Sequence, residues 1–340
     1  MVSLTLPLLC CFFFASPCQE PTPPIPVETQ AKPELHIRSL GVMGTDLEIK
    51  VIDADPEKAK KALDAAVAEI QRVEDMFTTW RDSPLNRLNA QAGKGFVQVP
   101  EELAKLVARS LAVAEVTHGA FDPTFASVGK LWDFKAVPPK LPSDSEIAAA
   151  LKKVGYRKVK IDLENSRISL PAGTRLGLGG IAKGYGVDRA MTVLMDHGIK
   201  NGVVNAGGDL KALGTKFGEP WRIAITHPRK GHKPVAVVPL SNICLVTSGD
   251  YERFFMVNGK RYHHILDPRT GRPATGCISA TVLAPDAAFA DALATAMVVL
   301  GPEEGLKVIE ALPRVNALLV DLEGHVFQSS GLPKKPNKAE

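Results

Sequence analysis

The sequence contains little cysteine, with five residues in a chain of 340. Cys10, Cys11 and Cys18 lie near the start, so only Cys244 and Cys277 remain in the body of the chain. Two cysteines are too few for a disulfide framework. We therefore expect apolar packing to hold the fold together, with Cys244 and Cys277 as small buried residues.

The chain also lacks an excess of charge of one sign, because its formal net charge is only +4. Lys and Arg are spread among Asp and Glu, which argues against a nucleic-acid partner. No second long apolar run follows the one at the start, so the sequence predicts no internal membrane span. A length of 340 residues allows one large domain or two.

The start of the chain is typical of an exported protein. Residues 1–18 form a short apolar segment like the hydrophobic part of a secretion signal, without the usual preceding Lys or Arg. Residues 19–35 form a Pro-rich linker. Together they indicate a lipoprotein on the periplasmic side of the inner membrane, lipidated at Cys18, although Pro17 is unusual at its position. The alternatives are a cleaved signal without lipid and a misassigned start.

The remainder is interpreted as one domain, residues 36–332, and a disordered tail, residues 333–340. Helical patterns alternate with hairpins, and no regular βαβ rhythm is present. The pattern predicts an α+β fold, with a mixed or antiparallel sheet and flanking helices. Its main signals are a helix start at Asp55-Pro56, a capping box at Ser143 and Glu146 in a helix ending at Gly155, a hairpin at Asn258-Gly259, and a helix from Asp286 that ends at Gly301.

A glycine cluster with Lys183 occupies residues 176–190 and leads directly into an amphipathic helix pattern. Clustered glycines permit close backbone approach and positive φ, and a helix start favours an anionic group. The stretch matches neither a Walker A loop nor a GxGxxG fingerprint. It therefore indicates either a phosphate-approach turn or a tight strand-to-helix turn without a ligand.

Two further groups of residues have chemical potential. Asp291 and Thr295 are an i, i+4 pair on one helix face, and their hard oxygens suit Mg²⁺. The alternative is a surface Asp and a Thr that bonds back to its own helix. His263 and His264 end a predicted strand and point to opposite faces, so at most one of them can enter a given site.

Taken in order, eight short motifs resemble the ApbE family, the FAD:protein FMN transferases. They run from about residue 40 to residue 300: MGT (43–45), FTTW with DSPLNRLN (77–89), GAFDPT (119–124), LGGIAKGYGVDRA (178–190), NAGGDL (205–210), TSGDYERFF (247–255), HHILDPRTG (263–271) and DALATA (291–296). The combination is specific, whereas no single motif would be.

The resemblance implies an ApbE-like (T-fold-like) architecture and a set of site residues. Mg²⁺ would be held by the Gly180 carbonyl and by the side chains of Asp291 and Thr295. Met43 and Trp80 would flank the flavin ring, and the rest of the FAD site would be lined by Ala120, Phe121, Asp122, Gly177, Lys183 and Ile265. Family members often carry Asp at position 177 and Tyr at position 80. Gly177 cannot supply a side-chain contact, whereas Trp80 keeps an aromatic face.

The implied reaction moves FMN from FAD to a Thr hydroxyl of a partner protein and releases AMP. The implied acceptors are redox subunits of the Na⁺-translocating NADH:quinone reductase or Rnf type. His264 is the first candidate for the base that accepts the hydroxyl proton, and Asp250 is the second. The alternatives are an FAD pyrophosphatase that forms FMN and AMP, and a periplasmic flavin-binding or carrier protein.

Overall fold

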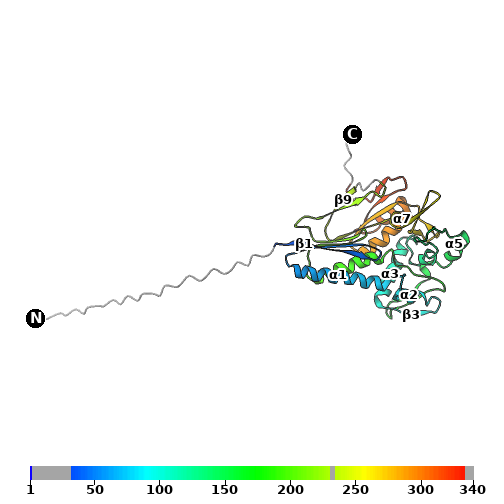
Figure 1. Cartoon of the computed structure of the whole chain (residues 1–340), viewed down its shortest axis with the longest axis horizontal. Helices are drawn as coiled ribbons and strands as arrows, with labels where there is room; N and C mark the ends of the chain where they lie inside the picture. The colour runs from blue at the N-terminus through cyan, green and yellow to red at the C-terminus, as the bar shows by residue number, and fades with distance from the viewer. Residues whose placement is uncertain (2–31, 230–233, 334–340) are drawn as a thin grey trace, which may run out of the picture. The chain divides into compact units, whose positions relative to one another are not determined.

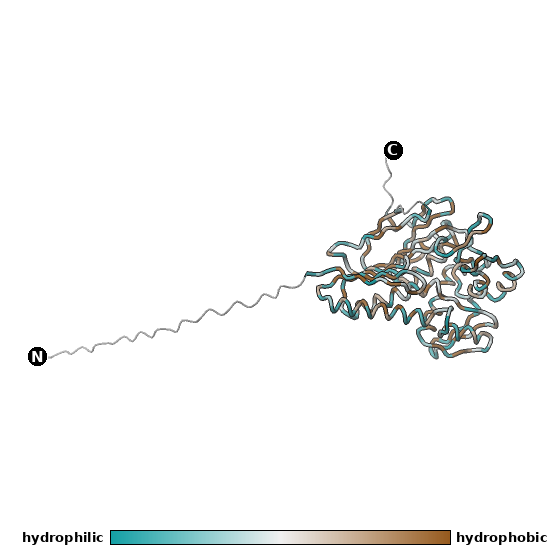
Figure 2. Tube along the Cα trace, viewed as in Figure 1, coloured by the Kyte–Doolittle hydropathy of each residue, from teal (hydrophilic) through white to brown (hydrophobic). Residues whose placement is uncertain are grey.

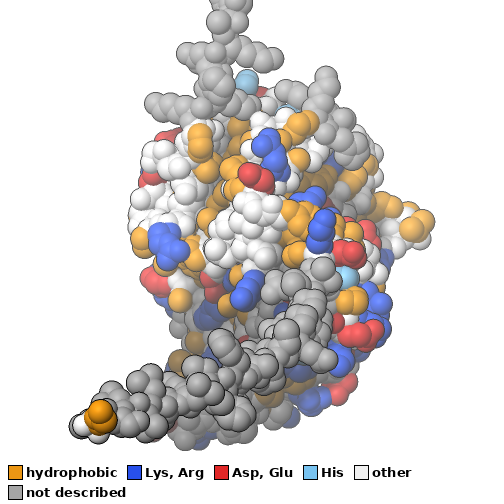
Figure 3. Space-filling model, turned by 90° about the vertical axis from the view of Figure 1, so that its left-hand side faces the viewer, with side chains coloured by type: hydrophobic (Ala, Val, Ile, Leu, Met, Phe, Trp, Pro, Cys, Tyr) orange, Lys and Arg blue, Asp and Glu red, His pale blue; other side chains and the backbone are white. Residues whose placement is uncertain are grey.

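The computed structural model describes Met1 and residues 32–229 and 234–333. The predicted signal segment with Cys18, most of the predicted linker and almost all of the predicted tail lie outside the described residues. Within them, no helix has the length and apolar character that crossing a membrane requires. Figure 3 shows Lys and Arg side chains next to Asp and Glu side chains, as the interspersed charges of the sequence lead us to expect.

An eight-stranded sheet forms the centre of the fold, and every neighbouring pair of its strands is antiparallel. Its strands, in spatial order, are β1 (Glu34–Val42), β2 (Thr45–Asp53), β6 (Gly202–Ala206), β7 (Asp209–Leu213), β10 (Ile243–Gly249), β15 (Ser279–Ala284), β16 (Asn316–Val320) and β17 (Val326–Gln328). The predicted α+β class is confirmed, and of the two predicted kinds of sheet the antiparallel one is present.

Three long helices, α1 (Pro56–Phe77), α6 (Ala182–Asp196) and α7 (Ala287–Glu310), pack side by side against this sheet (Figure 1). Their apolar faces and the strands form the largest buried cluster. A second cluster joins the sheet to the hairpin of β8 (Trp221–Thr226) and β9 (Pro234–Leu240). Figure 2 shows hydrophobic residues along the central strands and hydrophilic residues on the outer loops.

Shorter elements complete the domain. They are α2 (Pro84–Asn89), α3 (Glu101–Val116), α4 (Ala126–Gly129), α5 (Asp144–Leu151), 3-10 helices at Pro123–Phe125 and Tyr156–Lys158, a small sheet of β3 (Phe96–Gln98), β5 (Arg167–Ser169) and β4 (Lys160–Asp162), the hairpin of β11 (Phe254–Val257) and β12 (Lys260–His263), and the pair β13 (Leu266–Asp267) and β14 (Arg272–Pro273).

Local sequence signals located most element ends correctly. Asp55 caps α1 by accepting from the N–H groups of Glu57 and Lys58, and the predicted capping box at Ser143 is formed. Asn258 and Gly259 have φ angles of 49° and 74° between β11 and β12. Cys244 and Cys277 are free and buried, as expected.

One predicted helix end was wrong, and two short helices were missed. The helix expected to stop at Gly155 ends at Leu151. Gly301 adopts a non-helical φ of 75° and ends the helical run from Asp286 where the sequence predicted, and a second helical run follows it to Glu310. The short helices α2 and α4 were not predicted, because segments of six and four residues are too short for a hydrophobic period to be recognised.

The glycine cluster serves close packing. Its glycines do not adopt positive φ in this fully described stretch. A Cβ atom on Gly184 would lie 2.2 Å from the Ala287 carbonyl oxygen, and one on Gly177 would lie 2.9 Å from the Ala126 Cβ. Helix α6 therefore touches the start of α7 through its backbone. Of the two reasons for clustered glycines, close approach applies here.

We expect G184A to destabilise the fold by ~1–3 kcal/mol, because the added methyl group forces α6 and α7 apart. Urea unfolding followed by circular dichroism measures the change. G179A is the matched control, since a Cβ on Gly179 meets no atom within 4 Å. Equal free energies of unfolding for G184A and G179A would show that α6 and α7 can move apart with little loss of stability.

Candidate active site

The metal pair predicted on α7 faces the glycine cluster. The Gly184 N–H donates to Asp291 Oδ2 at 3.1 Å. A Cβ on Gly180 would lie 3.1 Å from Thr295 Oγ1, and the Thr295 hydroxyl lies 3.4 Å from the Ser248 hydroxyl on β10. The structure therefore brings Gly180, Asp291 and Thr295 together, and it adds a hydroxyl that sequence reasoning missed.

Asp209, the first residue of β7, is a second buried carboxylate beside this group. It is fully buried, and its Oδ1 accepts from Lys183 Nζ at 2.8 Å. Its Oδ2 has no hydrogen-bond partner among the described residues. Burial and the neighbouring Asp209 raise the pKa of Asp291 well above its usual value. Burial alone would lower the pKa of Lys183, but Asp209 and Asp291 outweigh it and raise that pKa.

These groups fit a divalent cation. Lys183 pairs with Asp209 and acts only electrostatically on Asp291, so a negative charge is left over when both carboxylates are ionised. A buried charge needs a partner, and carboxylate and hydroxyl oxygens are the ligands that Mg²⁺ prefers. Within the described part of the chain, no group bonds to Asp209 Oδ2, so this buried oxygen is free to bind a ligand.

His264, the first candidate base, is an imidazole with one buried nitrogen that bonds to no group in the described part of the chain. Its backbone N–H donates to the Arg253 carbonyl at 3.0 Å, and its Nδ1 is buried without a partner among the described residues. Burial, followed by the nearby Arg253 guanidinium, lowers its pKa to about 4. The imidazole is therefore neutral at pH 7, and its lowered pKa makes it a weaker base than a free histidine.

His263 and Asp250 belong to a different environment. His263 Nε2 bonds to the Ala274 carbonyl at 2.9 Å, so the two adjacent histidines do face different surroundings. The Asp250 carboxylate accepts a hydrogen bond from the Arg229 guanidinium, and Arg261 Nη1 lies 3.8 Å from Asp250 Oδ1. The Asp250 carboxylate is therefore engaged by arginines, whereas His264 Nδ1 has no partner among the described residues. Which of the two acts as the base stays a prediction.

The two predicted flavin-flanking residues lie near the end of α1. Met43 has φ 53° in the β1–β2 turn, and its N–H donates to Glu74 Oε2 on α1 at 3.1 Å. Trp80 follows the same helix and is 79% exposed, with Lys135 Nζ 5.3 Å from its ring centroid. An exposed aromatic ring is available for stacking on a ligand, and the flavin contact stays a prediction.

The other predicted FAD-lining residues border the glycine cluster. A Cβ on Gly180 would lie 3.3 Å from the Phe121 ring, and the Gly177 N–H donates to the Pro123 carbonyl at 2.8 Å. The Asp122 carboxylate accepts hydrogen bonds from the backbone N–H groups of Thr124 and Tyr156. Its side chain therefore orders this loop. Ala120 and Ile265 are buried.

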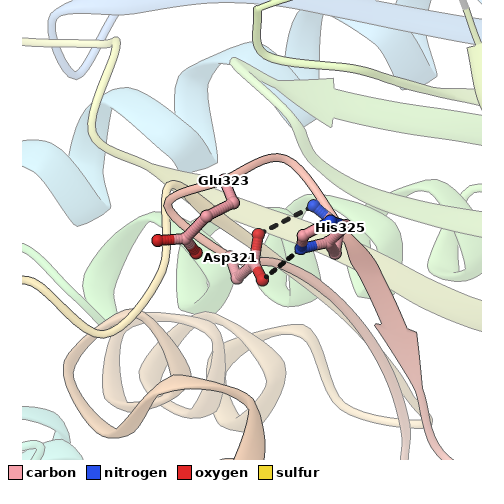
Figure 4. A group of neighbouring side chains, drawn as sticks. All are labelled: Asp321, Glu323 and His325. Atoms are coloured by element: carbon pink, nitrogen blue, oxygen red, sulfur yellow. Dashed lines mark hydrogen bonds and ion pairs between the residues drawn. The ribbon is translucent and has the colours of Figure 1, made fainter.

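A separate group of possible metal ligands lies at the β16–β17 turn (Figure 4). The Asp321 carboxylate accepts from the His325 N–H at 2.7 Å and lies 3.0 Å from His325 Nδ1. Glu323 and His325 are exposed. These bonds close the hairpin turn, and none of the three residues belongs to the motifs above, so we do not count the group as part of the active site.

Comparison with known sequences identifies relatives of the whole domain. The ApbE family model matches residues 43–319. The FAD:protein FMN transferase of Treponema pallidum is 35% identical over 323 residues, which cover 89% of each chain. That of Haemophilus influenzae is 34% identical over 309 residues, covering 86% of this chain and 89% of its own.

Solved structures show the same relationship. The ApbE protein of Thermotoga maritima superimposes with a TM-score of 0.80 at 37% identity, covering 87% of this chain and 97% of its own. The flavin transferase ApbE from Vibrio cholerae gives a TM-score of 0.76 at 32% identity, covering 88% of this chain and 98% of its own.

We expect His264 to stay neutral as the pH falls through 6.5, since its folded pKa is lowered to about 4. Nitrogen-15 NMR of labelled histidines from pH 8 to pH 5 tests this, with H264Q to assign the signal. The His264 signals should keep the shifts of a neutral imidazole down to about pH 5. A titration step near pH 6.5 at this residue would contradict the burial argument.

Proposed function

The chain belongs to the ApbE family of FAD:protein FMN transferases, and on that premise we propose that the cluster around Lys183, Asp291 and His264 performs the transfer with Mg²⁺. The observation that carries this proposal is the pair of buried carboxylates, Asp209 and Asp291: Lys183 pairs with Asp209, and its charge also acts on Asp291. FAD contains a pyrophosphate, and such a charge pattern suits a metal-bound phosphate group.

Phosphoryl transfer mostly requires positioning and charge stabilisation. We place Asp291, Thr295 and the Gly180 carbonyl as the residues that would hold Mg²⁺, with Asp209 beside them. When bound, the ion would neutralise charge on the phosphate oxygens. Lys183, fixed by Asp209 at 2.8 Å, would face the same phosphates. The remaining FAD contacts would come from Met43, Trp80, Ala120, Phe121, Asp122, Gly177 and Ile265.

The chemical step needs a proton acceptor. In our proposal the oxygen of an acceptor threonine forms a bond to the FMN phosphorus, and the bond from that phosphorus to the bridging oxygen breaks. The electron pair leaves with AMP, and the hydroxyl proton passes to His264. A positioned base of this kind contributes roughly 10²–10⁴-fold to the rate. The Nδ1 atom of His264, which has no partner among the described residues, supports this role because it is available to take the proton.

Two finer points extend the proposal. We propose that the acceptors are redox subunits of the NADH:quinone reductase or Rnf type, for which the family resemblance is the basis. We also propose export to the periplasmic side of the inner membrane with a lipid on Cys18. The apolar segment, the cysteine at its end and the Pro-rich linker support that location.

We expect D291N to lower FMN transfer at least about 100-fold, equivalent to ~2.7 kcal/mol of transition-state stabilisation. In-gel flavin fluorescence of a denatured acceptor subunit measures transfer, and chromatography measures free FMN and AMP. D196N is the matched control, because Asp196 is an exposed carboxylate at the end of α6.

Two outcomes of that assay would contradict the proposal. Free FMN and AMP with an unlabelled acceptor would support hydrolysis in place of transfer. Unchanged transfer by D291N would remove Asp291 from the metal site.

We expect the full chain expressed in a Gram-negative host to incorporate a radiolabelled fatty acid and to fractionate with membranes. C18S should lose the label and appear in the soluble periplasmic fraction, whereas C10S and C11S should keep it. A label that persists in C18S would contradict lipidation at this residue.

A further inference from the structure

Arg253 lies close to the candidate site, but the mechanism proposed above gives it no role. It lies in the loop between β10 and β11. A Cβ atom on Gly44 would lie 3.1 Å from its Nη2. Gly44 has φ 71° and follows Met43 in the β1–β2 turn. The guanidinium therefore lies over the turn that carries one of the two flavin-flanking candidates.

The Arg253 guanidinium is not committed to a protein partner. Across residues 32–229 and 234–333, no carboxylate lies within ion-pair distance of it, and its side chain donates no hydrogen bond. The two arginines nearest to it in the sequence differ, because Arg261 Nη1 lies 3.8 Å from Asp250 Oδ1 and Arg269 pairs with Asp267 at 2.8 Å. An exposed arginine without a carboxylate can accept an anionic ligand.

The surroundings of Arg253 point to the reacting phosphate. Its carbonyl oxygen accepts the His264 N–H at 3.0 Å, and both its guanidinium and the Lys183 ammonium act on the imidazole of His264. Lys183 is held by Asp209, so its position is fixed. Two cations from different parts of the fold therefore act on the candidate base.

We propose that Arg253 is a further substrate-binding residue, whose guanidinium binds phosphate oxygens of the FAD pyrophosphate together with Lys183. This inference rests on the proposed function. A guanidinium can hold two phosphate oxygens at once, which a lysine cannot. As the bond between the FMN phosphorus and the bridging oxygen breaks, the electron pair moves to the AMP phosphate, and Arg253 stabilises that added charge. Gly44 leaves room for the guanidinium.

The test compares R253Q and R253K with R261Q, a control that removes an arginine from the adjacent hairpin. Steady-state flavinylation of an acceptor gives kcat and the KM for FAD. We expect R253Q to lower kcat/KM for FAD by ~10²-fold, with part of the loss in kcat, because charge develops in the transition state. R253K should recover about a tenth of the wild-type value, and R261Q should stay within about twofold.

Several results would overturn the inference. Wild-type kcat/KM for FAD in R253Q would remove Arg253 from the substrate site. So would a loss confined to the KM for the acceptor protein, or equal losses in R253Q and R261Q. A thermal melt of each variant identifies loss of fold. If R253Q does not fold, R253K still tests the inference, because it keeps the positive charge but loses the guanidinium. If D291N abolishes transfer while R253Q does not, this inference alone fails, whereas normal transfer by D291N rejects the site itself.

Discussion

The backbone contact between α6 and α7 is the constraint on which the rest of the site depends. Gly184 allows the helices to meet at Ala287, and the same residue donates its N–H to Asp291. This close contact places the Asp291 carboxylate of α7 against the start of α6, where Gly184 directly follows Lys183. Any side chain at position 184 would move both groups, so the glycine that permits packing also sets the electrostatics of the site.

Much of the fold could be predicted because its signals are local. The cap at Asp55 and the turn at Asn258-Gly259 each depend on a few adjacent residues. The same holds for the i, i+4 relation of Asp291 and Thr295, which needs only a helix. Strand order could not be predicted, because β2 pairs with β6 across a long stretch of chain that holds several helices. No local pattern encodes such a pairing.

The site was predicted less completely than the fold, and for the same physical reason. Lys183 stood out in the sequence, but its partner Asp209 lies in a turn motif that many proteins share, and only tertiary structure brings the two to 2.8 Å. The glycines were interpreted partly as a route to positive φ, whereas here they permit contact. His264 was the first candidate base and Asp250 the second, and only tertiary structure shows the arginines that engage the Asp250 carboxylate.

The position of His264 depends in turn on an aromatic cluster that has no chemical role of its own. Tyr262 on β12 stacks on Trp132 and on Phe255 of β11, at centroid distances of 6.0 Å and 5.6 Å. Phe134 closes the group against Phe255. Aromatic pairs of this kind contribute ~0.5–1.5 kcal/mol each beyond burial. They hold the β11–β12 hairpin, whose two ends carry Arg253 and His264, so one packed hairpin orients both residues.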